Sequence, residues 1–267
     1  MSNDKPADWK NYEDFAVGSD ANRLPPTERL AGIQWRITLI GGTEMNLRFI
    51  DKNRLEWSQS AGPAAPASGT DWYEAIDVAG NVVFVDTLFQ SRPREAITYI
   101  VNTTTRRVLA IISTVAEKKT EGVPQVGQQF LPGVLGDPSI APSGPEPAPT
   151  RDLIGLRSIY RYSPTNVYEH IYLNSERYCW QCLVGVQRGH GDTDLATTYK
   201  FDDNQYIFTF REFIIPVASV FFYNMKQMRS TGKFLGITST GNIENNPAGA
   251  FIQKASMTFY PEDAQPV

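Results

Sequence analysis

The strongest constraint on the fold is an internal repeat. Sliding the sequence by 123 positions, without a gap, superposes identical residues at Leu30 and Leu153, Gly32 and Gly155, Arg54 and Arg177, Trp57 and Trp180, Thr70 and Thr193, Asp71 and Asp194, Asn81 and Asn204, and Arg106 and Arg229. The hydrophobic pattern keeps its phase too, because residues 81–86 fall on residues 204–209. The matches gather at turn starts, which favours tandem duplication of one structural unit.

Each half carries the same series of short apolar segments separated by turn residues such as Gly41-Gly42 and Gly80-Asn81. In the first half the predicted strands are Ile33–Leu39, Met45–Ile50, Arg54–Ser58, Tyr73–Val78, Val82–Leu88, Ala96–Asn102 and Arg107–Thr114. A helical pattern fits only the N-terminal arm and residues 124–130. Strands at this regular spacing predict an all-β protein of two tandem antiparallel β-barrels. An eight-stranded barrel has room for one small ligand.

Domain boundaries follow from composition. Residues 131–150 contain six prolines, which disfavour a regular central strand or helix and indicate a semi-rigid Pro-rich linker. The predicted parts are an N-terminal arm (1–24), a first barrel (25–130), the linker (131–150) and a second barrel (151–267). Trp9, Tyr12 and Phe15 are the arm's candidate docking residues.

Charge and hydropathy exclude several classes of function. The 25 Lys and Arg residues against 29 Asp and Glu residues give a net charge of −4, whereas nucleic-acid binding needs a basic patch or stripe. No apolar stretch is long enough to span a membrane as a helix. The N-terminal residues are polar and lack a signal-peptide core, which predicts a cytoplasmic protein.

The only two cysteines, Cys179 and Cys182, form a C-x-x-C motif. A redox dithiol or half a zinc site would need the two sulfur atoms to converge. The surrounding residues 177–184 have the composition of a strand, in which positions i and i+3 point to opposite faces. We therefore expect two unrelated thiols, with Cys182 on the same face as Tyr178 and Trp180, and no metal site.

The second half contains a run of motifs that resembles the MoaF family, labelled "molybdenum cofactor biosynthesis protein F". The motifs are Tyr168-Glu169-His170-Ile171-Tyr172-Leu173-Asn174, Trp180-Gln181-Cys182-Leu183, Thr193-Asp194, Tyr199-Lys200-Phe201-Asp202-Asp203, Tyr206-Ile207-Phe208, Arg211-Glu212 and Met228-Arg229-Ser230-Thr231-Gly232-Lys233. The first half matches more loosely, through Leu30-Ala31-Gly32 and Leu55-Glu56-Trp57. Phe210 departs from the family pattern, in which we associate this position with Trp.

The resemblance spans residues 30–261 and implies two calycin (lipocalin-like) barrels, in agreement with the repeat. The molybdenum label finds no support in the residues, because the chain lacks a Gly-rich phosphate-binding loop and a cluster of metal ligands. We therefore expect no cofactor.

Strand alternation sorts the candidate site residues of the second barrel. Tyr168, His170 and Tyr172 share one face of their strand, and Trp180 and Cys182 share a face of the next. If these faces turn inward, they form an aromatic pocket. A buried glutamate such as Glu212 can have its pKa raised into the range useful for proton transfer, while histidine and tyrosine orient a phenol or a carbonyl group.

We predict His170, Glu212 and Tyr168 as catalytic residues. The predicted substrate-binding residues are Tyr172, Trp180, Cys182, Tyr206, Phe208, Phe210 and Arg211. The opposing interpretation is that inward aromatic residues only fill a small barrel and that a buried histidine only satisfies its neighbours.

Three functions stay open on the sequence alone. The first is a cofactor-independent enzyme of the lyase, isomerase or decarboxylase type, acting on a small aromatic or phenolic molecule. The second is a carrier or sensor that binds a small hydrophobic or aromatic ligand without changing it. The third is a partner-binding module with filled barrels. A homodimer is compatible with each, and we expect neither nucleic acid nor membrane as a partner.

Overall fold

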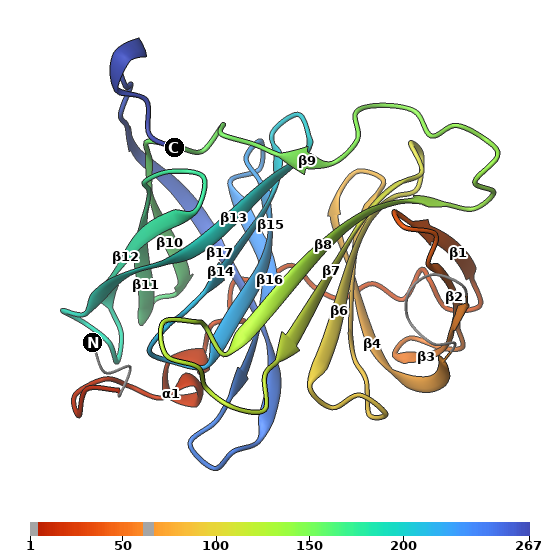
Figure 1. Ribbon diagram of the computed structural model, residues 1–267, viewed down its shortest axis with the longest axis horizontal. Helices are drawn as coiled ribbons and strands as arrows, with labels where there is room; N and C mark the ends of the chain where they lie inside the picture. The colour runs from red at the N-terminus through yellow and green to blue at the C-terminus, as the bar shows by residue number, and fades with distance from the viewer. Residues whose placement is uncertain (1–4, 61–66) are drawn as a thin grey trace. The chain divides into compact units, whose positions relative to one another are not determined.

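The computed structural model describes residues 5–60 and 67–267 and confirms the all-β prediction. The N-terminal barrel is closed and antiparallel, with its eight strands in sequence order (Figure 1). Its strands are β1 (Gln34–Leu39), β2 (Glu44–Phe49), β3 (Arg54–Ser60), β4 (Ala67–Ala79), β5 (Val82–Leu88), β6 (Glu95–Asn102), β7 (Arg107–Val115) and β8 (Val126–Leu135). Pairing of β8 with β1 closes the barrel.

The C-terminal barrel repeats this up-and-down topology. Its strands are β10 (Leu156–Ser163), β11 (Asn166–Tyr172), β12 (Arg177–Val184), β13 (Gly191–Asp202), β14 (Gln205–Arg211), β15 (Val217–Asn224), β16 (Arg229–Ile237) and β17 (Ile243–Met257). Pairing of β10 with β17 and of β12 with β13 closes it. The two-residue strand β9 (Ala148–Pro149) lies beside β13.

The described helical elements are short. They are α1 (Tyr12–Ala16) in the N-terminal arm and a 3₁₀ turn, η1 (Glu262–Ala264), near the C-terminus. Among the described residues, none of the helices has the length and apolar character needed to cross a membrane.

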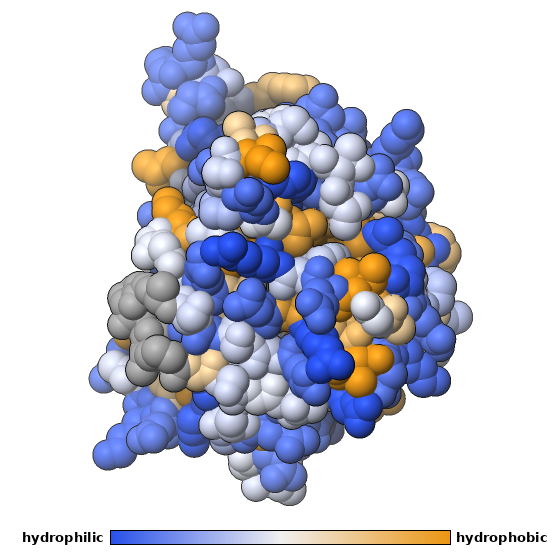
Figure 2. All heavy atoms as spheres, turned by 90° about the vertical axis from the view of Figure 1, so that its right-hand side faces the viewer, coloured by the Kyte–Doolittle hydropathy of each residue, from blue (hydrophilic) through white to orange (hydrophobic). Residues whose placement is uncertain are grey.

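Alternation of side chains builds the two barrel cores. In β1 and β2 every second residue is buried, because successive side chains of a strand point to opposite faces. The inward residues of the N-terminal barrel are mostly aliphatic and aromatic, as at Met45, Leu47 and Phe49. Figure 2 shows a face of the molecule on which hydrophilic side chains predominate and apolar ones gather in a few patches.

All seven strands predicted in the first half are present, with ends that differ by a few residues. The helical interpretation of residues 124–130 and the start of the linker at residue 131 are wrong, because β8 covers Val126–Leu135. A proline is tolerated there since this position needs only to accept a hydrogen bond. The backbone N–H of Ile40 donates to the carbonyl of Pro132 (2.8 Å).

The remainder of the predicted linker is fixed by two arginines. The Arg106 guanidinium donates to the carbonyls of Leu135, Asp137 and Ile140. The Arg107 guanidinium donates to the carbonyl of Gly144. Because side chains of the first barrel satisfy its carbonyls, this segment packs as part of that barrel rather than as a free spacer.

The chain divides into two compact units whose boundaries differ from the predicted ones. One unit consists of Leu24–Thr114 and Gln128–Ala148 and holds the N-terminal barrel. The other consists of Met1–Arg23, Val115–Gly127 and Pro149–Val267 and holds the C-terminal barrel. The N-terminal arm therefore belongs with the C-terminal barrel.

The repeat is real, but its register shifts by one residue after β14. Up to that strand the offset of 123 holds, because the pairing of Leu47 with Trp57 in one barrel matches that of His170 with Trp180 in the other. In β16 the strand Arg229–Ile237 corresponds to Arg107–Val115, so Arg229 is equivalent to Arg107 and not to Arg106. A gapless comparison cannot detect this shift in a loop.

Candidate functional site

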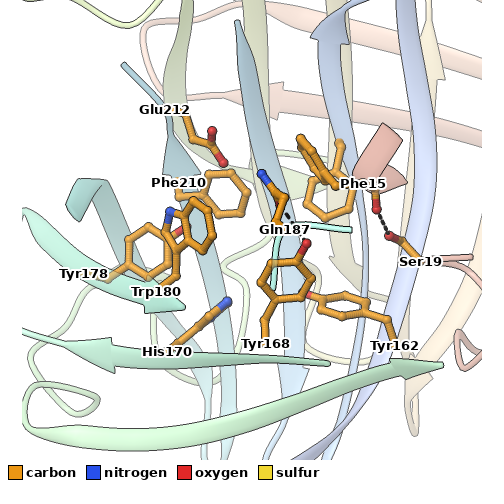
Figure 3. A pocket seen from close by; sticks show the side chains of 11 residues that line it. Phe15, Ser19, Tyr162, Tyr168, His170, Tyr178, Trp180, Gln187, Phe210 and Glu212 are labelled. Atoms are coloured by element: carbon orange, nitrogen blue, oxygen red, sulfur yellow. Dashed lines mark hydrogen bonds between the residues drawn. The ribbon is translucent and has the colours of Figure 1, made fainter. Parts of the chain in front are cut away.

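A small cavity lies inside the C-terminal barrel, and aromatic rings form most of its wall (Figure 3). It is lined by Phe15, Ser19, Tyr162, Tyr168, His170, Tyr178, Trp180, Gln187, Phe210, Glu212 and Phe234. Its volume is about 30 Å³, enough for one or two water molecules. In Figure 3 His170 and Glu212 point toward the cavity from opposite sides.

His170 enters the wall from the middle of β11, where the alternation of the strand turns it inward. Its ring lies 4.3 Å from the ring of Tyr160 and 5.1 Å from that of Tyr178, measured between centroids. Burial among these rings lowers the pKa of His170 to about 3, so the imidazole is neutral at pH 7. Its Nδ1 atom is buried and has no hydrogen-bond partner among residues 5–60 and 67–267.

Glu212 directly follows β14 and is also buried, with 6% of its surface exposed. Burial raises the pKa of its carboxyl group well above the ordinary value, and the neighbouring Asp194 carboxylate acts in the same direction. Within the described part of the chain, no cation or hydrogen-bond donor pairs with the carboxyl group of Glu212. Its surroundings therefore favour the protonated form of the carboxyl group.

Asp194 on β13 clamps one wall of the cavity. Its Oδ2 atom accepts a hydrogen bond from the indole Nε1 of Trp180 (2.9 Å), and its Oδ1 atom accepts one from the backbone N–H of Phe213 (3.2 Å). Burial raises the pKa of Asp194 to about 7, although both hydrogen bonds oppose this shift. The clamp fixes the indole and the chain segment that carries Glu212.

The same clamp occurs in the N-terminal barrel, at the positions that the repeat predicts. Asp71 accepts a hydrogen bond from the indole of Trp57 (2.7 Å) and one from the backbone N–H of Gln90 (2.8 Å). Phe89, equivalent to Glu212, packs on Trp57 with 4.6 Å between ring centroids. The clamp is thus a shared element of the fold, whereas the carboxyl group beside it is particular to the C-terminal barrel.

Tyr168 lies two residues before His170 on β11, at the cavity wall. Its hydroxyl donates to Oε1 of Gln187 (2.7 Å), a residue of the loop between β12 and β13. Burial raises the pKa of Tyr168, so its hydroxyl stays protonated. Cys182 pairs with Tyr168 across the strands and is one of two free thiols. Cys182, Tyr178 and Trp180 share the buried core, as predicted.

The N-terminal arm closes the remaining side of the cavity. Phe15 of α1 contributes its ring, which meets Phe234 edge to face at 5.7 Å between centroids. Tyr12 is fully buried, and its hydroxyl donates to the carbonyl of Phe234 (2.9 Å). The arm docks on the C-terminal barrel through Tyr12 and Phe15, because both side chains belong to the core of that barrel.

The structure gathers five of the predicted site residues at the cavity and places the others elsewhere. His170, Glu212, Tyr168, Trp180 and Phe210 line it. Tyr172 and Phe208 are core neighbours of His170, and the Tyr172 hydroxyl bonds those of Tyr160 and Tyr223.

Two predicted substrate-binding residues lie away from the cavity. Tyr206 donates to Oδ2 of Asp152 (3.1 Å). Arg211, on the opposite face of the chain from Glu212, donates to the Thr197 hydroxyl (3.0 Å). Alternation accounts for the position of Arg211, because neighbours along a strand point to opposite faces.

Six lining residues were missing from the predicted site: Phe15, Ser19, Tyr162, Tyr178, Gln187 and Phe234. The alternation of Ser158, Tyr160 and Tyr162 along β10 was a usable signal for Tyr162. Phe15 and Gln187 come from the arm and a loop, where no periodicity indicates the direction of a side chain.

No cluster of three or more histidine, cysteine or carboxylate groups suited to a metal ion occurs among residues 5–60 and 67–267. The groups that face the cavity are instead a carboxyl group with a raised pKa, a neutral imidazole and a phenol. This set can donate and accept protons and can orient a hydroxyl or carbonyl group.

Comparison with known proteins gives matches to both halves of the chain. The model described as "MoaF N-terminal domain" matches residues 7–117, and the model described as "MoaF C-terminal domain" matches residues 147–258. The chain is also similar to "Protein MoaF" of Klebsiella aerogenes, with 30% identity over 250 residues that cover 90% of this chain and 92% of that protein.

Proposed function

The chain belongs to the MoaF family, and we propose that its C-terminal barrel catalyses cofactor-independent acid–base chemistry on a small aromatic or phenolic molecule. The reaction class is that of a lyase, isomerase or decarboxylase. The observation that carries the proposal is that one aromatic cavity brings together Nδ1 of His170, which is buried without a hydrogen-bond partner among the described residues, and the buried Glu212 side chain.

Such groups are costly to the fold. A buried polar group without a partner costs about 1–3 kcal/mol. The equivalent positions of the N-terminal barrel hold Leu47 and Phe89, which are buried apolar residues. At these two positions the same fold is therefore compatible with apolar side chains, which favours a functional role for His170 and Glu212 over a role in packing.

The roles follow from the protonation states. Glu212, whose pKa is raised by burial, is suited to donate a proton to a carbonyl or a developing carbanion. The neutral imidazole of His170 can accept a hydrogen bond from a substrate hydroxyl group. Tyr168, held by Gln187, supplies a fixed phenol that orients the substrate, and the rings of Trp180 and Phe210 bind its aromatic face.

The test starts with a thermal-shift screen of the purified protein against hydroxycinnamates, aromatic amines and simple phenols, followed by mass spectrometry of every stabilising compound after incubation. The proposal predicts a compound that stabilises the protein and returns chemically changed. Glu212→Gln and His170→Leu should each lower its turnover by about 10²- to 10⁴-fold, the usual contribution of general acid–base catalysis.

Tyr206→Phe is the matched control, because Tyr206 lies on the same barrel but away from the cavity. Its turnover should equal that of the original protein. The acid–base proposal is wrong if Glu212→Gln and His170→Leu retain full turnover of an identified substrate.

A carrier or sensor of aromatic ligands is the second candidate. It is favoured by the aromatic wall, in which Tyr162, Tyr168, Tyr178, Trp180, Phe210 and Phe234 surround the cavity. This function predicts a ligand that stabilises the protein and returns unaltered. Removal of aromatic rings would then weaken binding, whereas Glu212→Gln would have little effect.

A further inference from the structure

The cavity is too small for the ligand that the proposed function requires. Its volume is about 30 Å³, whereas a dry cavity that accepts a benzene ring measures about 150 Å³. An aromatic molecule can therefore bind only if part of the lining moves aside.

The lining residues differ in how firmly the fold holds them. Most lie on or directly beside the paired strands of the barrel, so that moving them would disturb the sheet. Phe15, Ser19 and Gln187 come instead from the N-terminal arm and from the loop between β12 and β13. Of these three, only Phe15 presents a ring to the cavity (Figure 3).

We propose that Phe15 is a displaceable plug, and that an aromatic ligand binds by taking the place of its ring while the arm swings away from the cavity. This inference rests on the proposed function, since it concerns access to the same site. It makes Phe15 the residue that limits the size of the ligand.

The contacts of the arm fit this role. The ring of Phe15 meets the rings of Tyr12 and Phe234 edge to face. Its backbone carbonyl accepts hydrogen bonds from the Ser19 hydroxyl (3.1 Å) and from Nδ2 of Asn166 (3.3 Å). The bonds that Tyr12 makes to the backbone of β16 and β17 provide an anchor about which Phe15 can move.

The arm also contacts the loop between β12 and β13. The carboxylate of Asp8 lies 3.3 Å from Nε2 of His190, and the ring of Trp9 lies 5.1 Å from the His190 ring. His190 and Gln187 belong to one loop, in which Gly185 and Gly189 adopt positive φ angles of 139° and 91°. The arm thus rests on this loop through Asp8 and Trp9, and these contacts are lost when the arm swings away.

The experiment uses phenol as the probe and compares the full-length protein with Phe15→Ala by calorimetric titration. The variant should bind phenol about ten- to a hundredfold more tightly, because binding no longer requires a buried phenylalanine ring to be exposed. Val17→Ala is the matched control, since Val17 lies on the same arm and is exposed; its affinity should be unchanged. Equal affinity of the original protein and Phe15→Ala would overturn the plug.

Hydrogen exchange of the original protein gives a second test, which does not depend on the variant's folding. The backbone N–H of Gly249 donates to the carbonyl of Ser19 (2.8 Å) and loses this bond when the arm leaves. Saturating phenol should therefore speed exchange at Gly249. Slower or unchanged exchange in the phenol-bound protein would contradict displacement of the arm.

The two proposals fail in different ways. If Phe15→Ala tightens phenol binding while Glu212→Gln retains full turnover of an identified substrate, the plug stands and the acid–base proposal fails. If Glu212→Gln abolishes turnover while Phe15→Ala leaves the affinity unchanged, the reverse holds.

Discussion

The two barrels of this chain share the same strand topology and differ in the side chains that they enclose. Both have eight antiparallel strands in the same order and an Asp that clamps a Trp and a backbone N–H group. In the N-terminal barrel Leu47 and Phe89 complete an apolar core. In the C-terminal barrel the equivalent residues are His170 and Glu212, and a cavity lies between them.

This difference separates residues with a structural role from residues with a candidate functional role. Features common to both barrels, such as the Trp–Asp clamp, are explained by the requirements of the fold. Features of the C-terminal barrel alone, such as a buried carboxyl group facing an aromatic cavity, need another explanation. The comparison of the two barrels therefore identifies His170 and Glu212 as candidate functional residues more specifically than their burial alone does.

The largest loss of stability is expected when a glutamate replaces Phe89, the residue of the N-terminal barrel that is equivalent to Glu212. Phe89→Glu removes a ring that packs on Trp57 and beneath the Arg92 guanidinium, and places a carboxyl group beside a core of apolar side chains. We expect a loss of about 3–5 kcal/mol in the free energy of unfolding, measured by urea denaturation. Phe89→Leu is the control and should lose much less; an equal loss in both variants would mean that the carboxyl group is tolerated there.

Removing the clamp from each barrel should also destabilise the protein. Asp71→Ala leaves the indole N–H of Trp57 and the backbone N–H of Gln90 without an acceptor, at an expected cost of about 2–4 kcal/mol. Asp194→Ala should cost less, because it also removes a negative charge that acts on Glu212. Urea denaturation of both variants checks the order, and a larger loss for Asp194→Ala would contradict it.

The free energy of unfolding should rise, and not fall, when apolar residues replace His170 or Glu212 in the C-terminal barrel. Glu212→Leu and His170→Leu each remove an unpartnered buried polar group, and each should raise the free energy of unfolding by about 1–3 kcal/mol. Turnover should be lost at the same time. Destabilisation by both substitutions would show that the two groups serve the fold.

The smallest effect is a dependence of stability on pH. The pKa of Glu212 is higher in the folded than in the unfolded chain, so the folded state binds its proton more tightly. The stabilisation is complete below the unfolded pKa of 4.5 and is lost as the pH rises through the folded value.

Urea denaturation of the original protein and of Glu212→Gln, from about pH 5 to about pH 8, measures this contribution. The stability of the original protein relative to the variant should fall as the pH rises. A constant or growing difference would place the carboxyl group in the ionised form.

The sequence predicted most of the fold because strand formation leaves a local signal. Alternation located the strands and the inward faces of His170 and Trp180, and the repeat located both clamp tryptophans. The sequence analysis missed β8, because a strand that contains Pro132 has the composition of a loop. The position of Pro132 is decided by pairing with β1, which is distant in the sequence.

Prediction of the site succeeded for residues on strands and failed for those off them. Phe15 and Gln187 reach the cavity from an arm and a loop, whose paths depend on tertiary contacts. Arg211 was included for its chemistry, although its position next to Glu212 places it on the opposite face. The absence of a hydrogen-bond partner for Glu212 is a property of the folded chain and has no signature in the sequence.

The most direct test of the account uses the indole N–H groups of Trp57 and Trp180, which make the same hydrogen bond in the two barrels. Both signals are followed in ¹H–¹⁵N spectra, with assignment by Trp→Phe variants, while phenol is added. The account predicts that the Trp180 signal shifts in a saturable manner and that the Trp57 signal stays in place. A saturable shift of Trp57 alone, or no shift of either signal in Phe15→Ala, would contradict a ligand site in the C-terminal barrel.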